Sequence, residues 1–358
     1  MSVRTIKTAI KKFNKFLVSA HINPEGDSIG SQIAMASLLK RLGKGVVILN
    51  EGPVPHILQF MKGTEDVMKE MPASFDTFDG AKTPPFKAGK QAPLSINPEQ
   101  PPVFKSGCVE RVDFEAAIIL DCPDLTRVGN VVEHIAKGKS IINIDHHVSN
   151  ENFGKYNWVD IERSSVGEMV FELFKEFKLK PDYDDAVAIY VAMMTDTGSF
   201  KYSNTTSRTH RVTAELIEAG VRPYEIYGRI YETNSIQNTR LLGEALQTLK
   251  VSDDGKIAWL WVTKEMLKKT KASLEGTEGI INFARSIEGS EIAILFRETG
   301  TENRVKVSFR SKGNIDVNKL AASFSGGGHA TASGCTVFGK LEEVEKKVLI
   351  KACEMFEA

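Results

Sequence analysis

The sequence predicts a two-domain α/β protein in which a domain built on a parallel sheet is followed by a smaller mixed α+β domain. Three observations lead to this prediction. The chain has 358 residues, more than one hydrophobic core usually serves. Short, wholly apolar runs in its first half are typical of buried parallel strands, and they alternate with helical patterns. In the second half, the order of strand and helix patterns is that of a mixed α+β domain.

The composition narrows the class of protein. Lys and Arg together number 46, as do Asp and Glu, so the formal net charge is zero. A nonspecific coat on nucleic acid or on an anionic membrane is therefore not expected. The four cysteines form no CxxC pair, which argues against a disulfide framework or a zinc ribbon. The same cysteine pattern fits a reducing cytoplasm. Because no apolar run is long enough to span a bilayer, we expect a soluble protein with no membrane partner.

The first strand pattern covers residues 16–20 and leads into a polar loop at 21–28. Apolar residues recur at helical spacing after this loop, so the loop joins a strand to a helix. It carries His21, Glu25 and Asp27, side chains of the types that bind a hard or borderline cation. For Asp27 alone, an N-cap of the following helix is an equally good explanation.

The later strand patterns of the first half end in the same kinds of residue. The apolar run 116–120 is followed by Asp121. The next run, 141–144, is followed by an acid and two imidazoles, which are Asp145, His146 and His147. Each motif alone would suggest a cap or a turn. Because the carboxyl ends of parallel strands lie at one edge of a sheet, we expect these side chains to lie together.

One more acid follows a helix. Helical patterns cover 166–177 and 184–194, and Asp196 lies two residues beyond the second. The helix macrodipole disfavours an anion at that end, so this carboxylate needs a compensating positive charge. Four carboxylates in a partly desolvated cleft would also repel each other, whereas two divalent ions would remove the repulsion and are the usual device for hydrolysing phosphate esters. The expected ligands are His21, Glu25, Asp27, Asp121, His146 and Asp196, with His147 adjacent.

Regular patterning is absent at about 72–112, where prolines are concentrated. This composition predicts an irregular insertion, which could act as a lid. Helical patterns at 206–219 and 224–231 then complete the first half.

The second half begins near residue 234. Strand patterns cover 257–262, 291–296 and 304–310, and helical patterns cover 317–323 and 341–356. A loop at Gly326-Gly327-Gly328 would let backbone amides approach an anion, with His329 as a further donor. Arg310 lies at a strand end, where a guanidinium can hold a phosphate through two hydrogen bonds. The alternative for the glycine run is a flexible loop without a ligand.

Taken in order, these motifs resemble those of the DHH phosphoesterase superfamily. The resemblance rests on His21-Ile22-Asn23-Pro24-Glu25-Gly26-Asp27, Leu120-Asp121, Asp145-His146-His147 and Thr195-Asp196-Thr197-Gly198. Near the C-terminus, Ser308-Phe309-Arg310-Ser311, Asp316-Val317 and Gly326-Gly327-Gly328-His329 resemble the DHH-associated substrate-binding domain. Within the superfamily the chain is most similar to bacterial nano-RNases, oligoribonucleases that also dephosphorylate 3′-phosphoadenosine 5′-phosphate.

The resemblance implies two divalent ions, Mn²⁺ first and Mg²⁺ as the alternative. One ion would be held by His21, Glu25, Asp121 and Asp196, and the other by Asp27, Asp121, His146 and Asp196. In the catalytic step His147 would face the scissile phosphate, and Asp145 would orient a histidine. The terminal nucleotide would be held by Arg310, Ser311, Gly326, Gly327, Gly328 and His329. Glu25 stands where the family usually has aspartate, and its longer side chain is expected to preserve activity.

The expected domains are a DHH catalytic domain at 1–230, a linker at 231–240 and a substrate-binding domain at 241–358, with the active cleft between the two domains. The expected reaction is hydrolysis of very short single-stranded RNA or linear dinucleotides to mononucleotides, and of the 3′-phosphate of 3′-phosphoadenosine 5′-phosphate. Two alternatives remain: a manganese-dependent inorganic pyrophosphatase, and a nucleotide or RNA sensor in which Glu25 has weakened catalysis. A homodimer is expected by analogy.

Overall fold

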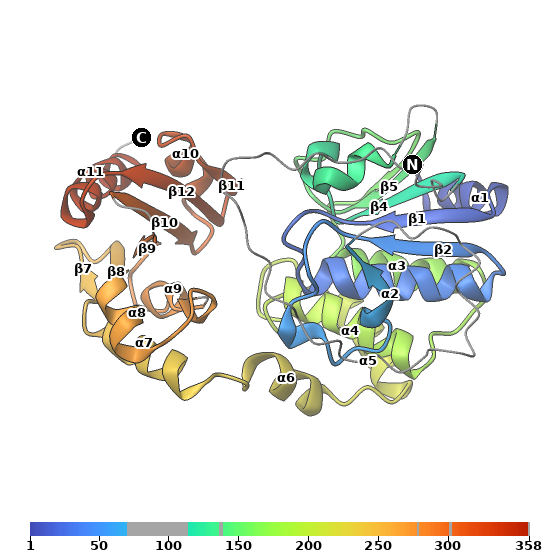
Figure 1. The fold of residues 1–358 in the computed structure, drawn as a ribbon, viewed down its shortest axis with the longest axis horizontal. Coiled ribbons are helices and arrows are strands. Elements are labelled where there is room, and N and C mark those ends of the chain that lie inside the picture. Colours follow the sequence, from blue (N-terminus) through green and yellow to red (C-terminus); the bar gives the residue numbers. More distant parts are fainter. Residues whose placement is uncertain (70–113, 136–138, 278, 301–302, 357–358) are drawn as a thin grey trace, which may run out of the picture. The chain divides into compact units, whose positions relative to one another are not determined.

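The computed structural model describes residues 1–69, 114–135, 139–277, 279–300 and 303–356. The insertion predicted at about 72–112 lies outside these residues. The chain forms two compact units, Met1–Glu232 and Thr233–Ala358, and Figure 1 shows the elements of each. No helix among the described residues is both long and apolar enough to cross a membrane.

The first unit is built on a six-stranded parallel sheet with the strand order β3-β2-β1-β4-β5-β6. Its strands are β1 (Lys15–Ser19), β2 (Gly45–Leu49), β3 (Val67–Met68), β4 (Ala116–Leu120), β5 (Ser140–Asp145) and β6 (Tyr156–Val159). The chain reverses its direction of winding between β1 and β4. Open α/β sheets bind their ligands outside the carboxyl ends of the strands at such a point. The predicted parallel sheet is therefore confirmed, with its ligand-binding edge next to His21 and Asp121.

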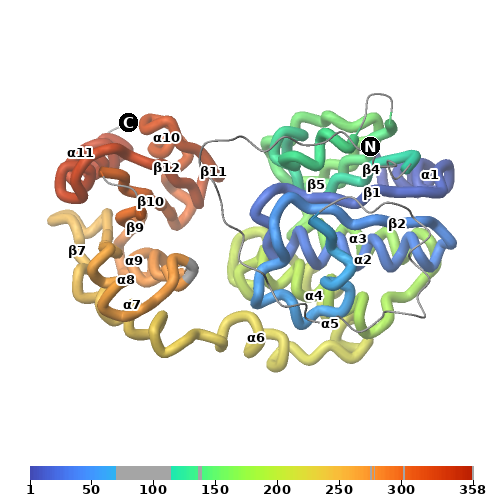
Figure 2. The backbone as a smooth tube through the Cα atoms, in the orientation of Figure 1, coloured from blue at the N-terminus to red at the C-terminus, as the bar shows by residue number. Residues whose placement is uncertain are grey.

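The α-helices of this unit pack on one face of the sheet. They are α1 (Val3–Lys12), α2 (Gly26–Arg41), α3 (Val166–Glu176), α4 (Tyr183–Asp196), α5 (Ser207–Glu218) and α6 (Pro223–Tyr231). Apolar residues of α1 to α4 share one core with the strands, and the 3₁₀ segment η4 (Leu125–Glu133) packs on the other face. Figure 2 shows the backbone path through these layers. The central strands are buried on both faces, which explains their continuous apolar sequences.

Close contact between helices positions the N-terminus of α2. A Cβ atom at Gly26 would lie 2.3 Å from Oγ1 of Thr195, and one at Gly30 would lie 2.3 Å from the carbonyl oxygen of Ala188. Both glycines therefore allow α2 to approach α4 more closely than any side chain would permit. Because Asp27 follows Gly26 and Asp196 follows Thr195, this contact brings two predicted ligands together.

The second unit contains a mixed six-stranded sheet with the order β11-β12-β10-β9-β8-β7, in which only β8 and β9 pair in parallel among the described strands. Its strands are β7 (Lys250–Val251), β8 (Ile257–Val262), β9 (Ile292–Glu298), β10 (Arg304–Ser311), β11 (Gly327–His329) and β12 (Ala332–Phe338). Its helices are α7 (Ile236–Leu246), α8 (Lys264–Thr270), α9 (Ile281–Arg285), α10 (Val317–Ala322) and α11 (Leu341–Glu354). The predicted mixed α+β fold of this half is confirmed.

One local prediction in this unit was wrong. Gly327–His329, expected to lie in a loop, forms the edge strand β11, which pairs with β12. Glycines carry no side chains, so the run gives no alternating pattern by which a strand could be recognised. An edge strand still leaves one side of its backbone without a partner strand.

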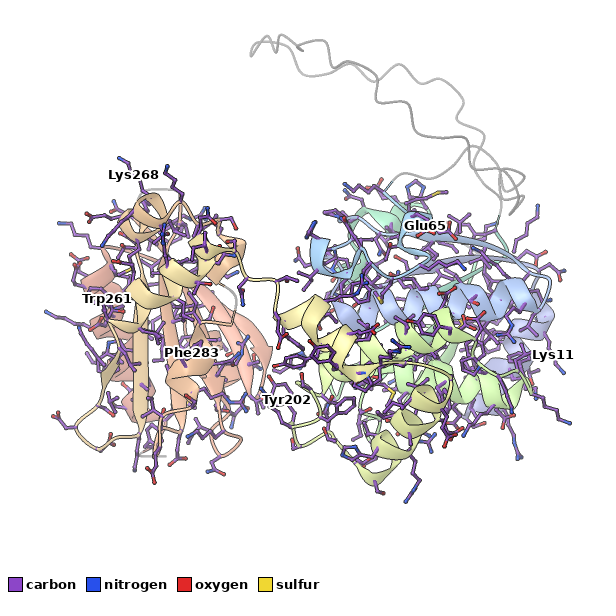
Figure 3. All side chains as sticks on the ribbon, turned by 90° about the horizontal axis from the view of Figure 1, so that it is seen from below. Lys11, Glu65, Tyr202, Trp261, Lys268 and Phe283 are labelled. Atoms are coloured by element: carbon purple, nitrogen blue, oxygen red, sulfur yellow. The ribbon has the colours of Figure 1, made fainter. Side chains whose placement is uncertain are left out.

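Charged side chains of both signs project from each unit. Those labelled in Figure 3 include Lys11 and Glu65 in the first unit and Lys268 in the second, and all three are exposed. This mixture of signs agrees with the zero formal net charge of the chain.

Candidate metal centre

Seven predicted side chains meet at the carboxyl edge of the parallel sheet. They come from the ends of β1, β4 and β5, from the start of α2 and from the last residue of α4. Their candidate ligand atoms form three groups, within each of which the atoms lie no more than 4.8 Å apart. The groups are His21, Glu25 and Asp121; Asp27, His146 and Asp196; and Asp121, His146 and His147.

The first group is linked by a serine. Nδ1 of His21 donates to the carbonyl oxygen of Ile22 at 2.7 Å, so Nε2 is directed towards Asp121, whose Oδ2 lies 3.4 Å away. The Ser28 hydroxyl donates to the same Oδ2 at 2.7 Å and lies 2.9 Å from Nε2 of His21. Sequence reasoning missed Ser28, because a serine at the start of a helix is usually a capping residue.

Around the second group, carboxylate oxygens lie on several sides of one imidazole nitrogen of His146. Nε2 of His146 lies 3.9 Å from Oδ2 of Asp27, 3.8 Å from Oδ1 of Asp121 and 3.6 Å from Oδ2 of Asp196. These distances are too long for good hydrogen bonds and are what atoms around a shared cation require. Nδ1 of His146 contacts the carbonyl oxygen of Arg163 at 3.2 Å. That nitrogen must be the donor, which leaves Nε2 as the ligand atom.

Asp27 does not cap its own helix. Glu25 is the N-cap residue of α2 and makes no side-chain capping bond. The carboxylate of Asp27, which is 1% exposed, instead accepts hydrogen bonds from Val166 N at 2.7 Å and Gly167 N at 2.9 Å, at the start of α3. The capping explanation is thereby excluded, and the carboxylate is held towards His146.

The backbone of Asp121 is also unusual. Its φ is +52°, in the left-handed region that costs a non-glycine residue about 1–2 kcal/mol. Such conformations persist where the surroundings impose them, and they cluster at functional sites. Here the turn brings the carboxylate back towards both groups of ligand atoms.

Asp145 holds the histidine pair in place. Its wholly buried carboxylate accepts from Nδ1 of His147 at 2.7 Å, from the backbone N–H of His146 at 2.8 Å and from Nδ2 of Asn150 at 2.6 Å. These three bonds set the ring orientation of His147 and the backbone direction at His146. Asn150 was another residue that sequence reasoning missed.

The electrostatics of the site favour a bound cation. Burial, with added repulsion from Asp121, raises the pKa of Asp196 to about 6, although His146 opposes the rise. Burial and the charges of Asp121 and Asp196 raise the pKa of Asp27 well above its usual value. The same causes raise the pKa of Glu25 to about 7, although this side chain keeps an exposed surface. A bound divalent ion would offset the repulsion among these three carboxylates and favour their charged forms.

The pKa values of His147 and Asp121 shift so that both side chains stay charged. Burial alone would lower the pKa of His147, but hydrogen bonding to Asp145 and the charges of Asp121, Asp145 and Asp196 raise it to about 9. Burial alone would raise the pKa of Asp121, but its hydrogen bond to His21 and the nearby imidazoles hold it below its usual range. Imidazole nitrogens and carboxylate oxygens are both ligands that divalent metal ions use in proteins. The residues therefore fit the metal ions that the sequence implied.

The predicted substrate-binding residues lie on the second sheet. Arg310 and His329 both pair with Ala332, from opposite sides, so they belong to one row across β10, β12 and β11. Ser311 follows Arg310 in the strand and is wholly buried, because successive side chains point to opposite faces. The structure therefore brings Arg310 and His329 to one face, and Ser311 does not join them.

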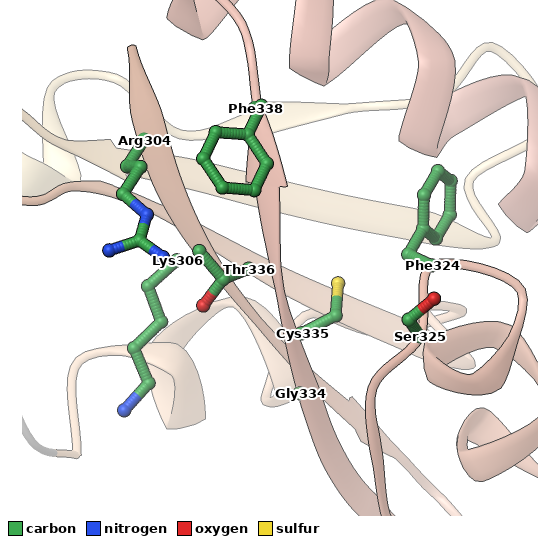
Figure 4. Close-up of a pocket in the computed structure, with 8 residues that line it drawn as sticks. All are labelled: Arg304, Lys306, Phe324, Ser325, Gly334, Cys335, Thr336 and Phe338. Atoms are coloured by element: carbon green, nitrogen blue, oxygen red, sulfur yellow. The ribbon is translucent and has the colours of Figure 1, made fainter. Parts of the chain in front are cut away.

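The face of β10 that carries Arg310 also carries Arg304 and Lys306, since every second residue shares a face. These two cations line a cavity of about 440 Å³, shown in Figure 4. Its other lining residues are Phe324, Ser325, Gly334, Cys335, Thr336 and Phe338. The guanidinium carbon of Arg304 lies 5.0 Å from the ring centroid of Phe338.

Comparisons with known proteins agree with this architecture. The model of the DHH family, N-terminal domain, matches residues 15–194, and that of the DHHA1 domain matches residues 241–357. The chain is 26% identical over 341 residues to the bifunctional oligoribonuclease and PAP phosphatase NrnA of Bacillus subtilis, covering 94% of each. It is 28% identical over 335 residues to the protein of the same name from Thermus thermophilus, covering 93% of this chain and 87% of that one. A solved structure of an exopolyphosphatase-related protein from Bacteroides fragilis superimposes with a TM-score of 0.82 and 28% identity, covering 98% of this chain and 95% of that one.

Proposed function

This chain belongs to the DHH family, and from that premise we propose that it hydrolyses very short single-stranded RNA and linear dinucleotides to mononucleotides. We propose that it also removes the 3′-phosphate of 3′-phosphoadenosine 5′-phosphate. The observation that carries the proposal is the gathering of four carboxylates and three imidazoles at one sheet edge. The names of the relatives from Bacillus subtilis and Thermus thermophilus support the choice of substrate.

DHH phosphoesterases depend on divalent metal ions, and we propose that this chain holds two of them. His21, Glu25 and Asp121 would hold one of them. Asp27, His146 and Asp196 would hold the other, with Asp121, which also lies in a group with His146, near enough to be shared. We favour Mn²⁺ over Mg²⁺, because each group contains an imidazole nitrogen and Mg²⁺ prefers oxygen ligands alone.

When bound, a pair of divalent ions supplies the positive charge that stabilises the attacking and leaving oxygens in a displacement at phosphorus. The protein supplies orientation. Asp145 fixes the ring of His147 through Nδ1, so that Nε2 is the atom we propose to hydrogen-bond an oxygen of the scissile phosphate. Burial of Asp145 keeps water from competing for that bond.

We propose that the second unit binds the terminal nucleotide, with Arg310 and His329 contacting its phosphate. Their shared row and the neighbouring cations Arg304 and Lys306 support an anionic ligand. The glycines at 326–328 would contribute backbone groups at the sheet edge, and Ser311 would support the strand from the opposite face. Recognition of one terminal nucleotide favours short substrates over long polymers.

The proposed partners are therefore short RNA, dinucleotides and 3′-phosphorylated nucleotides. A cytoplasmic location and a homodimer remain predictions. Light scattering of the purified protein tests the homodimer, which predicts twice the mass of one 39.5 kDa chain.

The decisive experiment measures Mn²⁺-dependent release of mononucleotide from a labelled dinucleotide, with inorganic pyrophosphate as a second substrate. We expect turnover of the dinucleotide and almost none after Asp121→Asn, which removes a ligand common to two of the groups. Turnover of pyrophosphate alone would favour the pyrophosphatase alternative. Tight binding of the dinucleotide without hydrolysis would favour the sensor.

A further inference from the structure

We propose that Glu168, a buried residue outside every motif discussed above, positions the ligands of one of the two metal ions. The proposal rests on the metal site of the proposed function and not on the choice of substrate. Glu168 lies in the first turn of α3 and is wholly buried. Glu168 acts on the metal site through the segment 163–167, which leads from β6 into α3.

The carboxylate of Glu168 is held from several directions. Oε1 lies 2.7 Å from Nε of Arg208 and 3.4 Å from Nη1 of Arg163. Oε2 accepts from the Ser164 hydroxyl at 2.6 Å and contacts Ser164 N at 3.3 Å and the Thr209 hydroxyl at 3.5 Å. A buried charge with this many partners fixes the positions of all of them. It therefore ties the segment before α3 to the start of α5.

The backbone of this short segment contacts two of the three residues in one ligand group directly. The carbonyl oxygen of Arg163 accepts from Nδ1 of His146 at 3.2 Å. The amides of Val166 and Gly167 donate to the carboxylate of Asp27 at 2.7 and 2.9 Å. These bonds orient the ligand atoms, because one holds the ring nitrogen of His146 opposite Nε2 and the other two hold both oxygens of Asp27.

The third residue of the group is reached through an asparagine. Nδ2 of Asn204 donates to the carbonyl oxygen of Ser164 at 2.9 Å and lies 3.3 Å from Oδ2 of Asp196. Ser164 is the residue whose hydroxyl and amide contact Glu168. One carboxylate thus supports Asp27, His146 and Asp196 together.

The other ligand group does not share this support. Among the described residues, the polar contacts of His21 go to Ile22, Ser28 and Asp121, and no hydrogen bond joins Glu25 to the segment 163–167. Loss of the Glu168 carboxylate should therefore weaken one ion and spare the other. A general loss of stability would affect both.

The test is Mn²⁺ binding to the full chain without substrate, measured by titration calorimetry and by the loss of the free-ion signal in electron paramagnetic resonance. The unchanged protein should bind two ions. Glu168→Gln should keep one affinity and weaken the other about 10- to 100-fold, the usual effect of removing a partner behind a metal ligand. Two unchanged affinities, or an equal weakening of both, would overturn the proposal.

Glu172→Gln is the matched control. Glu172 lies on the same helix and pairs with the same two arginines at 2.9 and 2.7 Å, and among the described residues it has no hydrogen bond to Ser164 or Thr209. Glu172→Gln should leave both Mn²⁺ affinities unchanged. A loss of affinity equal to that of Glu168→Gln would overturn the proposal, because the pairing with arginine would then explain the effect.

If Glu168→Gln does not fold, Ser164→Ala is the second test. This variant removes the 2.6 Å hydrogen bond to Glu168 and should weaken the binding of the same single ion. If the unchanged protein binds no pair of ions, the proposed function itself fails.

Discussion

The close contact between α2 and α4 predicts that an alanine at position 30 destabilises the protein, whereas helix propensity alone predicts a gain in stability. Gly30→Ala replaces a helical glycine by the best helix former, which alone should stabilise the protein by about 1 kcal/mol. The added Cβ, however, would lie 2.3 Å from the carbonyl oxygen of Ala188 and 3.1 Å from Cβ of Ala192. The nearer atom belongs to the backbone of α4, so it cannot rotate away, and the helices must move apart.

Overpacking of a core usually costs about 1–3 kcal/mol, and a backbone overlap belongs at the upper end of that range. Subtracting the gain in propensity leaves a net loss of about 2 kcal/mol for Gly30→Ala. In a unit of this size, that loss should lower the midpoint of thermal unfolding by about 4–8 °C. The same displacement separates α2 from α4, and so Asp27 from Asp196, which should weaken Mn²⁺ binding.

Gly228→Ala in α6 is the control within the same unit. The nearest atom to its added Cβ is Oε2 of Glu232 at 3.6 Å, an ordinary contact with the end of a flexible side chain. This variant should therefore be slightly more stable, by about 0.5–1 kcal/mol. The assay is thermal and urea unfolding followed by circular dichroism in excess chelator. A Gly30→Ala protein as stable as the unchanged one would refute the close packing on which the site depends.

Three further predictions concern the site itself. Asp145→Asn should lower the rate of dinucleotide hydrolysis about 10- to 100-fold, because it removes the charge that orients His147, and an unchanged rate would contradict that role. In chelator, the midpoint of thermal unfolding should fall as the pH rises from about 6.5 to 9. The pKa of His147 is about 9 in the folded protein against a usual 6.5. Protonated His147 therefore stabilises the folded state fully below pH 6.5, and this contribution is lost as the pH approaches 9. A midpoint that rises over this range would be inconsistent with the raised pKa. Gly326→Ala should raise KM for the dinucleotide more than it lowers kcat, because the added Cβ would lie 2.3 Å from the carbonyl oxygen of Gly334 and displace the edge strand; steady-state kinetics distinguish the two constants.

The ligand-bearing ends of the strands could be predicted because local sequence determines them. An apolar run without interruption indicates a buried strand, and β4 begins and ends where the run 116–120 does. Once the strands are parallel, their carboxyl ends lie at one edge, so Asp121 and His146 had to be neighbours. No knowledge of distant contacts was needed.

The residues that support those ligands could not be predicted, because their partners are far away in the sequence. Ser28 donates to a carboxylate 93 residues further along the chain, and Asn204 donates to the carbonyl of Ser164, 40 residues before it. A serine, an asparagine or a lone glutamate such as Glu168 has no distinctive spacing. Their roles depend on tertiary packing alone.

The central claim is that side chains from separate strand and helix ends hold two divalent ions. The most direct measurement is anomalous X-ray scattering from crystals grown with Mn²⁺. We predict two peaks, one in contact with His21, Glu25 and Asp121 and one in contact with Asp27, His146 and Asp196. A single peak, or peaks only at other residues, would contradict the claim.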